Sequence, residues 1–109
     1  MKIENFNPLS FDWNNISTQQ VNGETGFAII KTQTLGEIKI RHIEYSSNYT
    51  ADHWCDKGHI VFIIKGELKI EHKDNSIHYI KSGMTYLIGD NTLAHKAKSE
   101  LGAIALIID

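Results

Sequence analysis

Residues 51–66 read ADHWCDKGHIVFIIKG, and this stretch places potential metal-ligand side chains directly before an apolar strand. Side chains two residues apart face the same side of an extended chain, so His53 and Cys55 are expected to point together and Trp54 to point away. His59 follows across a polar segment that contains a glycine, and a turn there would bring His59 back toward the same pocket. The stretch therefore predicts a cluster of imidazole and thiol groups at the start of a buried strand.

Short β-type segments continue on both sides of this stretch. The apolar run at residues 60–65 is typical of a strand buried on both faces, and Gly66 is expected to end it at a bend. Turn residues such as Gly, Asn, Asp and Ser separate the segments, and no sustained helical periodicity appears. Strands are expected at residues 27–34, 37–45, 60–65, 67–72, 77–81, 85–88 and 104–108. This spacing predicts an all-β fold, either an antiparallel sandwich or a barrel.

The donor types in the cluster favour a divalent transition metal, with Zn, Ni, Fe or Cu as the candidates. Neutral imidazole binds all of these ions, and a thiolate adds a preference for the softer ones. His95, which follows the turn-rich residues 89–91, is a fourth candidate beside His53, Cys55 and His59. Four protein ligands would close a tetrahedron, whereas three would leave a position for water or a ligand. The sequence leaves both arrangements open, and it also leaves Cys55 open as a reactive thiol or a packed core residue.

The spacing of these residues resembles the two sequence motifs of the cupins, a family of small β-barrels. The first motif is matched by His53-x-Cys55-x3-His59-x6-Gly66, and the second, loosely, by Gly83-x5-Gly89-x-Asn91-x3-His95. Cys55 stands where the family has a second His, and His59 where it has a Glu, so the set of ligands loses a carboxylate and gains a thiolate. Three segments, GETG at residues 23–26, EYS at residues 44–46 and ADHWC-x-KGH at residues 51–59, also resemble the DHCW-motif group of bacterial cupin-fold proteins. The resemblance implies a single-domain jelly-roll barrel with a metal pocket formed by His53, Cys55, His59 and His95, and no particular reaction.

Two further residues are expected to line the ligand pocket. Tyr86 lies in the strand that leads to the second motif, and its hydroxyl would reach the pocket mouth. His42 alternates with residues that are expected to face outward on its strand, so it would point inward. His72 and His78 flank a predicted hairpin turn at residues 73–76 and are expected on the solvent side or at the strand ends.

The chain is expected to divide into an N-terminal arm, residues 1–25, and a barrel domain, residues 26–109. The apolar residues of the arm would pack on one sheet or on a barrel end, and the arm would cover a sheet edge or cross to a partner. We therefore expect a homodimer.

Composition excludes several classes of function. The formal net charge is −2, and the Lys and Arg residues are scattered singly along the chain. The chain therefore lacks the basic stripe that binding to nucleic acid or to an anionic membrane would require. A single Cys rules out an intramolecular disulfide, and the N-terminus lacks the features of a signal peptide, so a cytoplasmic location is expected. The remaining interpretation is a binding or sensing module for a small polar metabolite. The alternative is a metal-dependent enzyme of the dioxygenase or isomerase type.

Overall fold

The computed structural model describes residues 3 and 6–109. Strand β5 (His59–His72) extends through both sheets of the fold. The sequence predicted a break at Gly66, yet the strand continues through that residue with a positive φ of 78°. A Cβ atom at Gly66 would lie 2.3 Å from the carbonyl oxygen of Gly102, so this position requires glycine. A register shift between Ile63 and Lys65 bends the strand, and β5 therefore belongs to two sheets.

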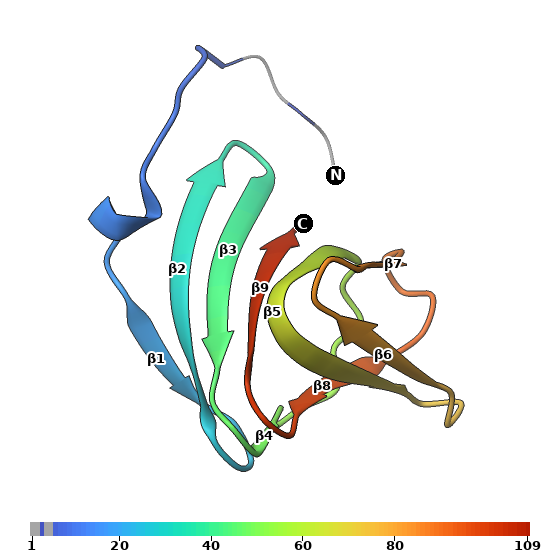
Figure 1. Ribbon diagram of the computed structural model, residues 1–109. Helices are drawn as coiled ribbons and strands as arrows, with labels where there is room; N and C mark the ends of the chain where they lie inside the picture. Colours follow the sequence, from blue (N-terminus) through green and yellow to red (C-terminus); the bar gives the residue numbers. More distant parts are fainter. Residues whose placement is uncertain (1–2, 4–5) are drawn as a thin grey trace.

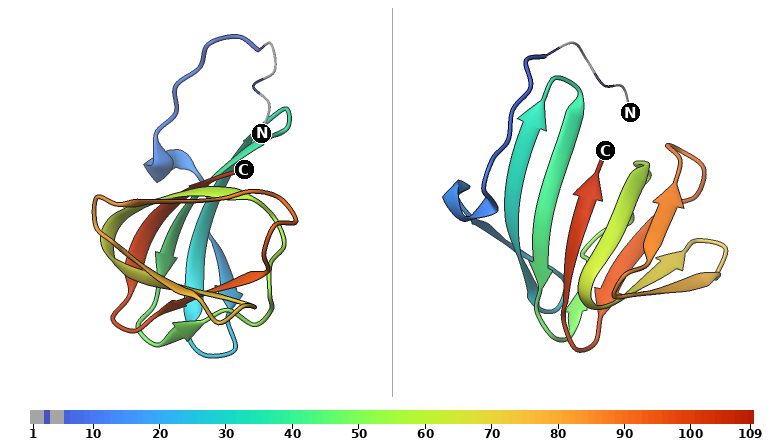
Figure 2. Two further views of the ribbon diagram at one scale, coloured as in Figure 1. Left: turned by 90° about the vertical axis from the view of Figure 1, so that its right-hand side faces the viewer. Right: turned by 45° about the horizontal axis from the view of Figure 1, so that its top comes forward.

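Two antiparallel sheets curl around a shared interior (Figures 1 and 2). The first sheet contains, in order, β1 (Gln19–Asn22), β2 (Phe27–Leu35), β3 (Ile38–Tyr45), β9 (Ala103–Ile108), the first half of β5, and β7 (Thr85–Ile88). The second contains β4 (Tyr49–Thr50), β8 (His95–Ser99), the second half of β5, and β6 (Ile77–Lys81). The predicted all-β class is confirmed; β1, β4 and β8 lie in segments where the sequence predicted no strand.

The core lies between the two inner faces. Its most buried members alternate along their strands, and they include Ile63, Leu68 and Ala105. The prediction that residues 60–65 are buried on both faces is wrong, because Phe62 and Ile64 are 41% and 45% exposed. The sheet is covered on its inner face only, so the apolar run supplies the core with every second side chain.

The N-terminal segment meets the outer face of the first sheet. Residues 1–2 and 4–5 of the predicted arm lie outside the described part of the chain. A short 3₁₀ helix, η1 (Trp13–Asn15), places Trp13 against the ring of His42, with 5.7 Å between the ring centroids. The later part of the segment joins the sheet as β1, paired with β2. Across the described residues, no helix has both the length and the apolar character needed to cross a membrane.

Candidate metal centre

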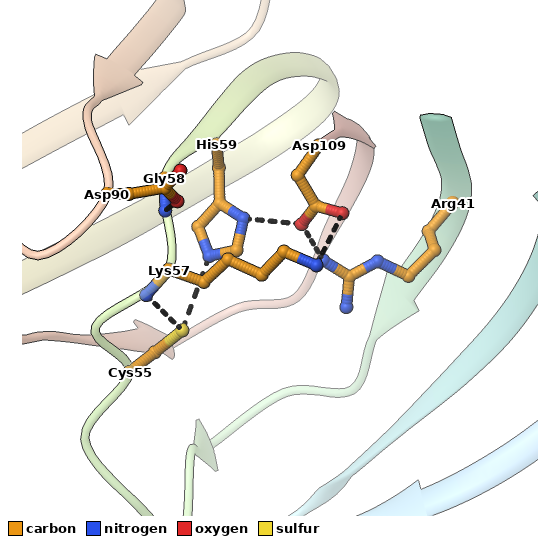
Figure 3. A network of polar contacts seen from close by, with 7 residues as sticks. All are labelled: Arg41, Cys55, Lys57, Gly58, His59, Asp90 and Asp109. Carbon is orange, nitrogen blue, oxygen red and sulfur yellow. Dashed lines mark hydrogen bonds and ion pairs between the residues drawn. The ribbon is translucent and has the colours of Figure 1, made fainter. Parts of the chain in front are cut away.

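Backbone pairing brings Cys55 beside His95, although 40 positions of sequence numbering separate them. The amide of Cys55 donates to the carbonyl of His95 at 2.8 Å, and the amide of His95 donates back at 3.0 Å. The turn between Cys55 and β5 is held by the Gly58 amide, which donates to Oδ1 of Asp90 at 2.6 Å (Figure 3). A Cβ atom at Gly58 would lie 2.7 Å from the amide nitrogen of Asp90, so the turn depends on glycine at this position.

This turn returns the chain so that His59, the first residue of β5, faces Cys55. Nε2 of His59 lies 3.4 Å from Sγ of Cys55 (Figure 3), and the rings of His59 and His95 meet edge to face with centroids 5.2 Å apart. One ligand atom from each of Cys55, His59 and His95 lies within 4.8 Å of the others. We call these three residues the Cys–His–His group.

Hydrogen bonds fix which nitrogen of each imidazole is available. Nδ1 of His59 lies 2.7 Å from Oδ2 of Asp109, and Nδ1 of His95 lies 3.1 Å from the carbonyl oxygen of Leu93. Both partners are acceptors, so each neutral imidazole carries its proton on Nδ1 and presents the lone pair of Nε2. A carboxylate or carbonyl behind the imidazole is the usual support of a metal-bound histidine.

The charges around His59 keep it suitable as a ligand. Burial lowers the pKa of His59, and this effect exceeds the opposite effect of Asp109. Burial by itself would raise the pKa of Asp109, but the neighbouring Arg41, His59 and Lys57 outweigh it and hold that pKa below its usual value. At neutral pH the carboxylate is therefore charged and the imidazole is neutral, which is the form that binds metal.

The distance between Cys55 and His59 fits a tetrahedral transition metal. Bond lengths of about 2.3 Å to sulfur and about 2.0 Å to nitrogen place the two donor atoms about 3.5 Å apart around a tetrahedral ion, close to the distance between Cys55 and His59. Within the described part of the chain, the buried Nε2 of His95 has no hydrogen-bond partner. A buried polar atom without a partner is costly, and an ion at this position would satisfy it.

Two of the predicted site residues lie apart from this group. The imidazole of His53 is 76% exposed and pairs with Asp52 at 2.6 Å. It lines the same cavity as Cys55, His59 and His95, but its ring is not among the three clustered ligands. His42 is paired with Leu106 and Lys31 on the outer face of the first sheet, where Trp13 contacts it. The apolar inner face of β3 is formed by Ile43 instead, which is the physical reason that His42 points outward.

Tyr86 lies in the interior, where its hydroxyl is 2.7 Å from Nε2 of His72. Nδ1 of His72 lies 3.1 Å from the carbonyl oxygen of Ser76, so the neutral imidazole donates there and accepts from Tyr86. His72 is the last residue of β5, so the expected place at a strand end is correct, but the ring does not face solvent, because the residue is 5% exposed. Its strand places every second side chain in the core, and the bond to Tyr86 satisfies the buried ring.

A cavity of about 240 Å³ extends from the Cys–His–His group into the barrel. Apolar side chains from both sheets form most of its wall, and Tyr86 and Arg41 also line it. The volume lies slightly below the usual range for ligand pockets, so the cavity suits a small molecule. The group thus stands at a site where a bound ion and a small ligand would meet.

No sequence motif indicates Asp109 or Arg41 as site residues. Asp109 follows β9, and its side chain is 3% exposed and paired with His59 and Arg41 (Figure 3). An aspartate at the end of an apolar strand carries no motif signal, and the alternation on β3 was interpreted with the wrong face inward. The inward-facing Arg41 would have been apparent from the correct alternation, because Ile43 lies two residues further on the same face.

Solved structures of cupins resemble this chain in fold. An RmlC-like cupin from Shewanella frigidimarina is 13% identical, with 94% of this chain and 89% of that one covered and a TM-score of 0.76. A cupin-like protein from Thermotoga maritima is 16% identical, with coverages of 78% and 69% and a TM-score of 0.68. The iron(II) protein Fe(II)-HppE, solved with the alternative substrate (S)-1-HPP, is 8% identical, with coverages of 94% and 60% and a TM-score of 0.75. No protein-family model and no curated protein matches the sequence.

These similarities and the sheet topology show that the chain has the cupin fold. Within that fold it carries a Cys–His–His group as a possible metal site. Membership of the DHCW-motif group stays a prediction.

Proposed function

We propose that this protein holds a divalent transition metal through Cys55, His59 and His95 and binds a small polar metabolite in the adjoining cavity. The buried Nε2 of His95, without a hydrogen-bond partner in the described residues, is the observation that carries this proposal. One ligand atom of His95 lies within 4.8 Å of the thiol of Cys55 and of a ring nitrogen of His59. Nitrogen and sulfur donors in this combination match Zn and the other borderline ions.

The residues around the group have distinct functions in this proposal. Asp109 accepts the Nδ1 proton of His59 and keeps the ring oriented, and the Leu93 carbonyl does the same for His95. The backbone amide of Lys57 lies 3.4 Å from Sγ of Cys55 and would stabilise a thiolate. The metal, when bound, would polarise a ligand oxygen as a Lewis acid.

Catalysis is the second candidate function, and the number of ligands favours it. Three protein ligands leave one position for water or substrate, which is typical of catalytic rather than structural sites. Fe(II)-HppE, which has a similar fold, is described with an iron ion and a substrate. The reaction would then be of the dioxygenase or isomerase type on a small molecule.

Metal analysis of protein purified without an affinity tag tests the proposal. We expect close to one equivalent of Zn, Ni, Fe or Cu in the wild type, or after incubation with each ion. Cys55→Ala and His95→Ala should lose most of it, while His78→Ala, which changes an exposed histidine, should retain it. Less than about a tenth of an equivalent in wild-type protein under all these conditions would refute the metal site.

Binding and catalysis are separated by the state of the fourth coordination position. In the metal-loaded protein, exchange of a coordinated water with added azide or cyanide, followed by the absorption spectrum of a Co(II) substitute, indicates an open position. An unresponsive spectrum would favour a structural or sensing site.

We also propose that the protein is a homodimer. The outer face of the first sheet exposes the apolar residues Phe62 and Leu87, which are 41% and 68% exposed. Together with Ile64 they form an apolar area that a second copy would cover. Sedimentation that gives the mass of one chain at micromolar concentration would refute the dimer.

A cytoplasmic location is part of the same proposal. Cys55 is a free cysteine in the structure, and the reducing cytoplasm would preserve the thiol as a ligand. Fractionation of cells that produce the native protein tests this location.

A further inference from the structure

Arg41 brings a positive charge into the wall of the cavity that adjoins the Cys–His–His group. It lies on β3 opposite Ile107, and both residues line this cavity. Nη2 of Arg41 donates to Oδ2 of Asp109 at 2.8 Å, and the guanidinium lies beside the carboxylate in Figure 3. Nε of Arg41 is buried and has no hydrogen-bond partner within residues 3 and 6–109, and the same holds for Oδ1 of the neighbouring Asp109.

An unpaired N–H in the interior is costly, because it has lost water without gaining an acceptor. An acceptor within the cavity would recover this energy. The guanidinium is planar and presents its N–H groups as a rigid fork that matches a carboxylate better than it matches any neutral group. The orientation of Arg41 thus favours an anionic ligand group.

The charges around the site also favour an anion. Asp109 is the carboxylate in contact with Arg41, and the same carboxylate interacts with His59 at 2.7 Å and with Lys57 at 3.5 Å. Two permanent cations, Arg41 and Lys57, therefore share the one side-chain carboxylate of Asp109. A divalent ion on the Cys–His–His group would increase this positive charge.

The rest of the cavity selects an apolar body of limited size. Its volume is about 240 Å³. Apart from Arg41 and the Cys–His–His group, the wall includes Lys96 and three tyrosines, and much of the rest is aliphatic: Ile30, Ile43, Val61, Leu68, Ile70 and Ile107. A ligand that fills this space would bury hydrocarbon there and direct its charged end toward Arg41.

We propose that the ligand is a small organic acid whose carboxylate binds to Arg41 beside the metal group and whose hydrocarbon part occupies the aliphatic end of the cavity. This inference rests on the proposed function, since it names the ligand class of the same cavity. Arg41 is the specificity-determining residue, and it separates carboxylates from neutral molecules of equal shape.

Calorimetric titration with hexanoate and hexanamide tests the inference, because these two probes differ in charge and hardly in shape. Both are titrated into Zn-loaded protein and into protein freed of metal with a chelator. We expect hexanoate to bind at least about tenfold more tightly than hexanamide. Arg41→Gln should remove this preference. Lys31→Gln removes the same charge and is the matched control. It should retain the preference for hexanoate, because Lys31 lies opposite His42 on the outer face of the sheet.

Arg41→Lys is a second variant, needed in case Arg41→Gln fails to fold. It keeps a cation near Asp109 and lacks the guanidinium fork. We expect it to fold and to lose most of the preference for hexanoate. Equal binding of the two probes by wild-type protein, or binding of neither, would overturn the inference, as would an unchanged preference in Arg41→Lys and Arg41→Gln.

The metal content of the same samples distinguishes this result from the proposed function. Protein that binds no metal but still prefers hexanoate through Arg41 would refute the metal site and support the carboxylate inference. Protein that binds metal but does not prefer hexanoate would support the metal site and refute the carboxylate inference.

Discussion

Nε2 of His59 and Sγ of Cys55 lie 3.4 Å apart, with the imidazole proton held on the far nitrogen by Asp109. The two side chains come from opposite ends of a short turn, and His95 joins them from a different strand. This relationship turns a group of ordinary residue types into a possible three-ligand site. The predictions below follow from it and from its neighbours.

Replacement of Cys55 by Ser should change the spectrum of the Co(II)-loaded protein. A thiolate ligand gives an intense charge-transfer absorption in the near ultraviolet, and a hydroxyl does not, so the band should disappear and the affinity should fall. His53→Ala is the matched control, because His53 is exposed and paired with Asp52. Loss of the Co(II) spectrum in His53→Ala would instead indicate a four-ligand site.

Asp109→Asn should weaken metal binding by about 10- to 100-fold, because the charged acceptor behind His59 is lost while the shape is kept. Competition with a chromophoric chelator measures the affinity. Asp52→Asn removes an equivalent charge beside His53 and should leave the affinity unchanged. Equal affinities of wild type and Asp109→Asn would exclude this role of the carboxylate.

The metal-free protein should lose stability as the pH falls from about 7 toward about 5. The pKa of His59 is lowered from its ordinary 6.5 in the folded protein, chiefly by burial, so the unfolded chain takes up a proton first. The loss begins near the unfolded value and is complete below the folded one. The lowered pKa of Asp109 adds a further loss below its ordinary 3.8.

Urea unfolding at several pH values measures this dependence. His59→Gln should flatten it between about pH 7 and about pH 5, whereas His78→Gln should leave it unchanged. A wild-type free energy of unfolding that stays constant or rises over this range would contradict the prediction.

Tyr86→Phe should lower the free energy of unfolding by about 1–3 kcal/mol, because Nε2 of the buried His72 loses its donor. Tyr79→Phe removes a hydroxyl from a side chain that is 53% exposed and should change the free energy by less than about 0.5 kcal/mol. Denaturant titrations of the two variants compare them. Equal effects would show that the bond between Tyr86 and His72 contributes no net stability.

Local pattern was sufficient for most of the strands. Alternation along residues 67–72 and the turn residues at 73–76 predicted the hairpin that β5 and β6 form. The same reasoning failed at Gly66, because a positive φ at glycine lets a strand bend without ending. It also missed β8, whose sequence HKAKS lacks apolar alternation and is held in place by pairing with β4 and β5.

The all-β class and the spacing that makes Cys55, His59 and His95 candidate ligands can be predicted from the amino-acid sequence, because strand alternation and turn chemistry are local properties of the chain. The three-dimensional arrangement of the strands is needed to show that His53 is exposed, that His42 lies on the outer face, and that Asp109 and Arg41 lie beside the group. Those outcomes depend on which strands are neighbours and which face of each strand is buried. Cooperative packing of segments that are distant in sequence sets both, and the position of one residue in the sequence does not indicate how those segments pack.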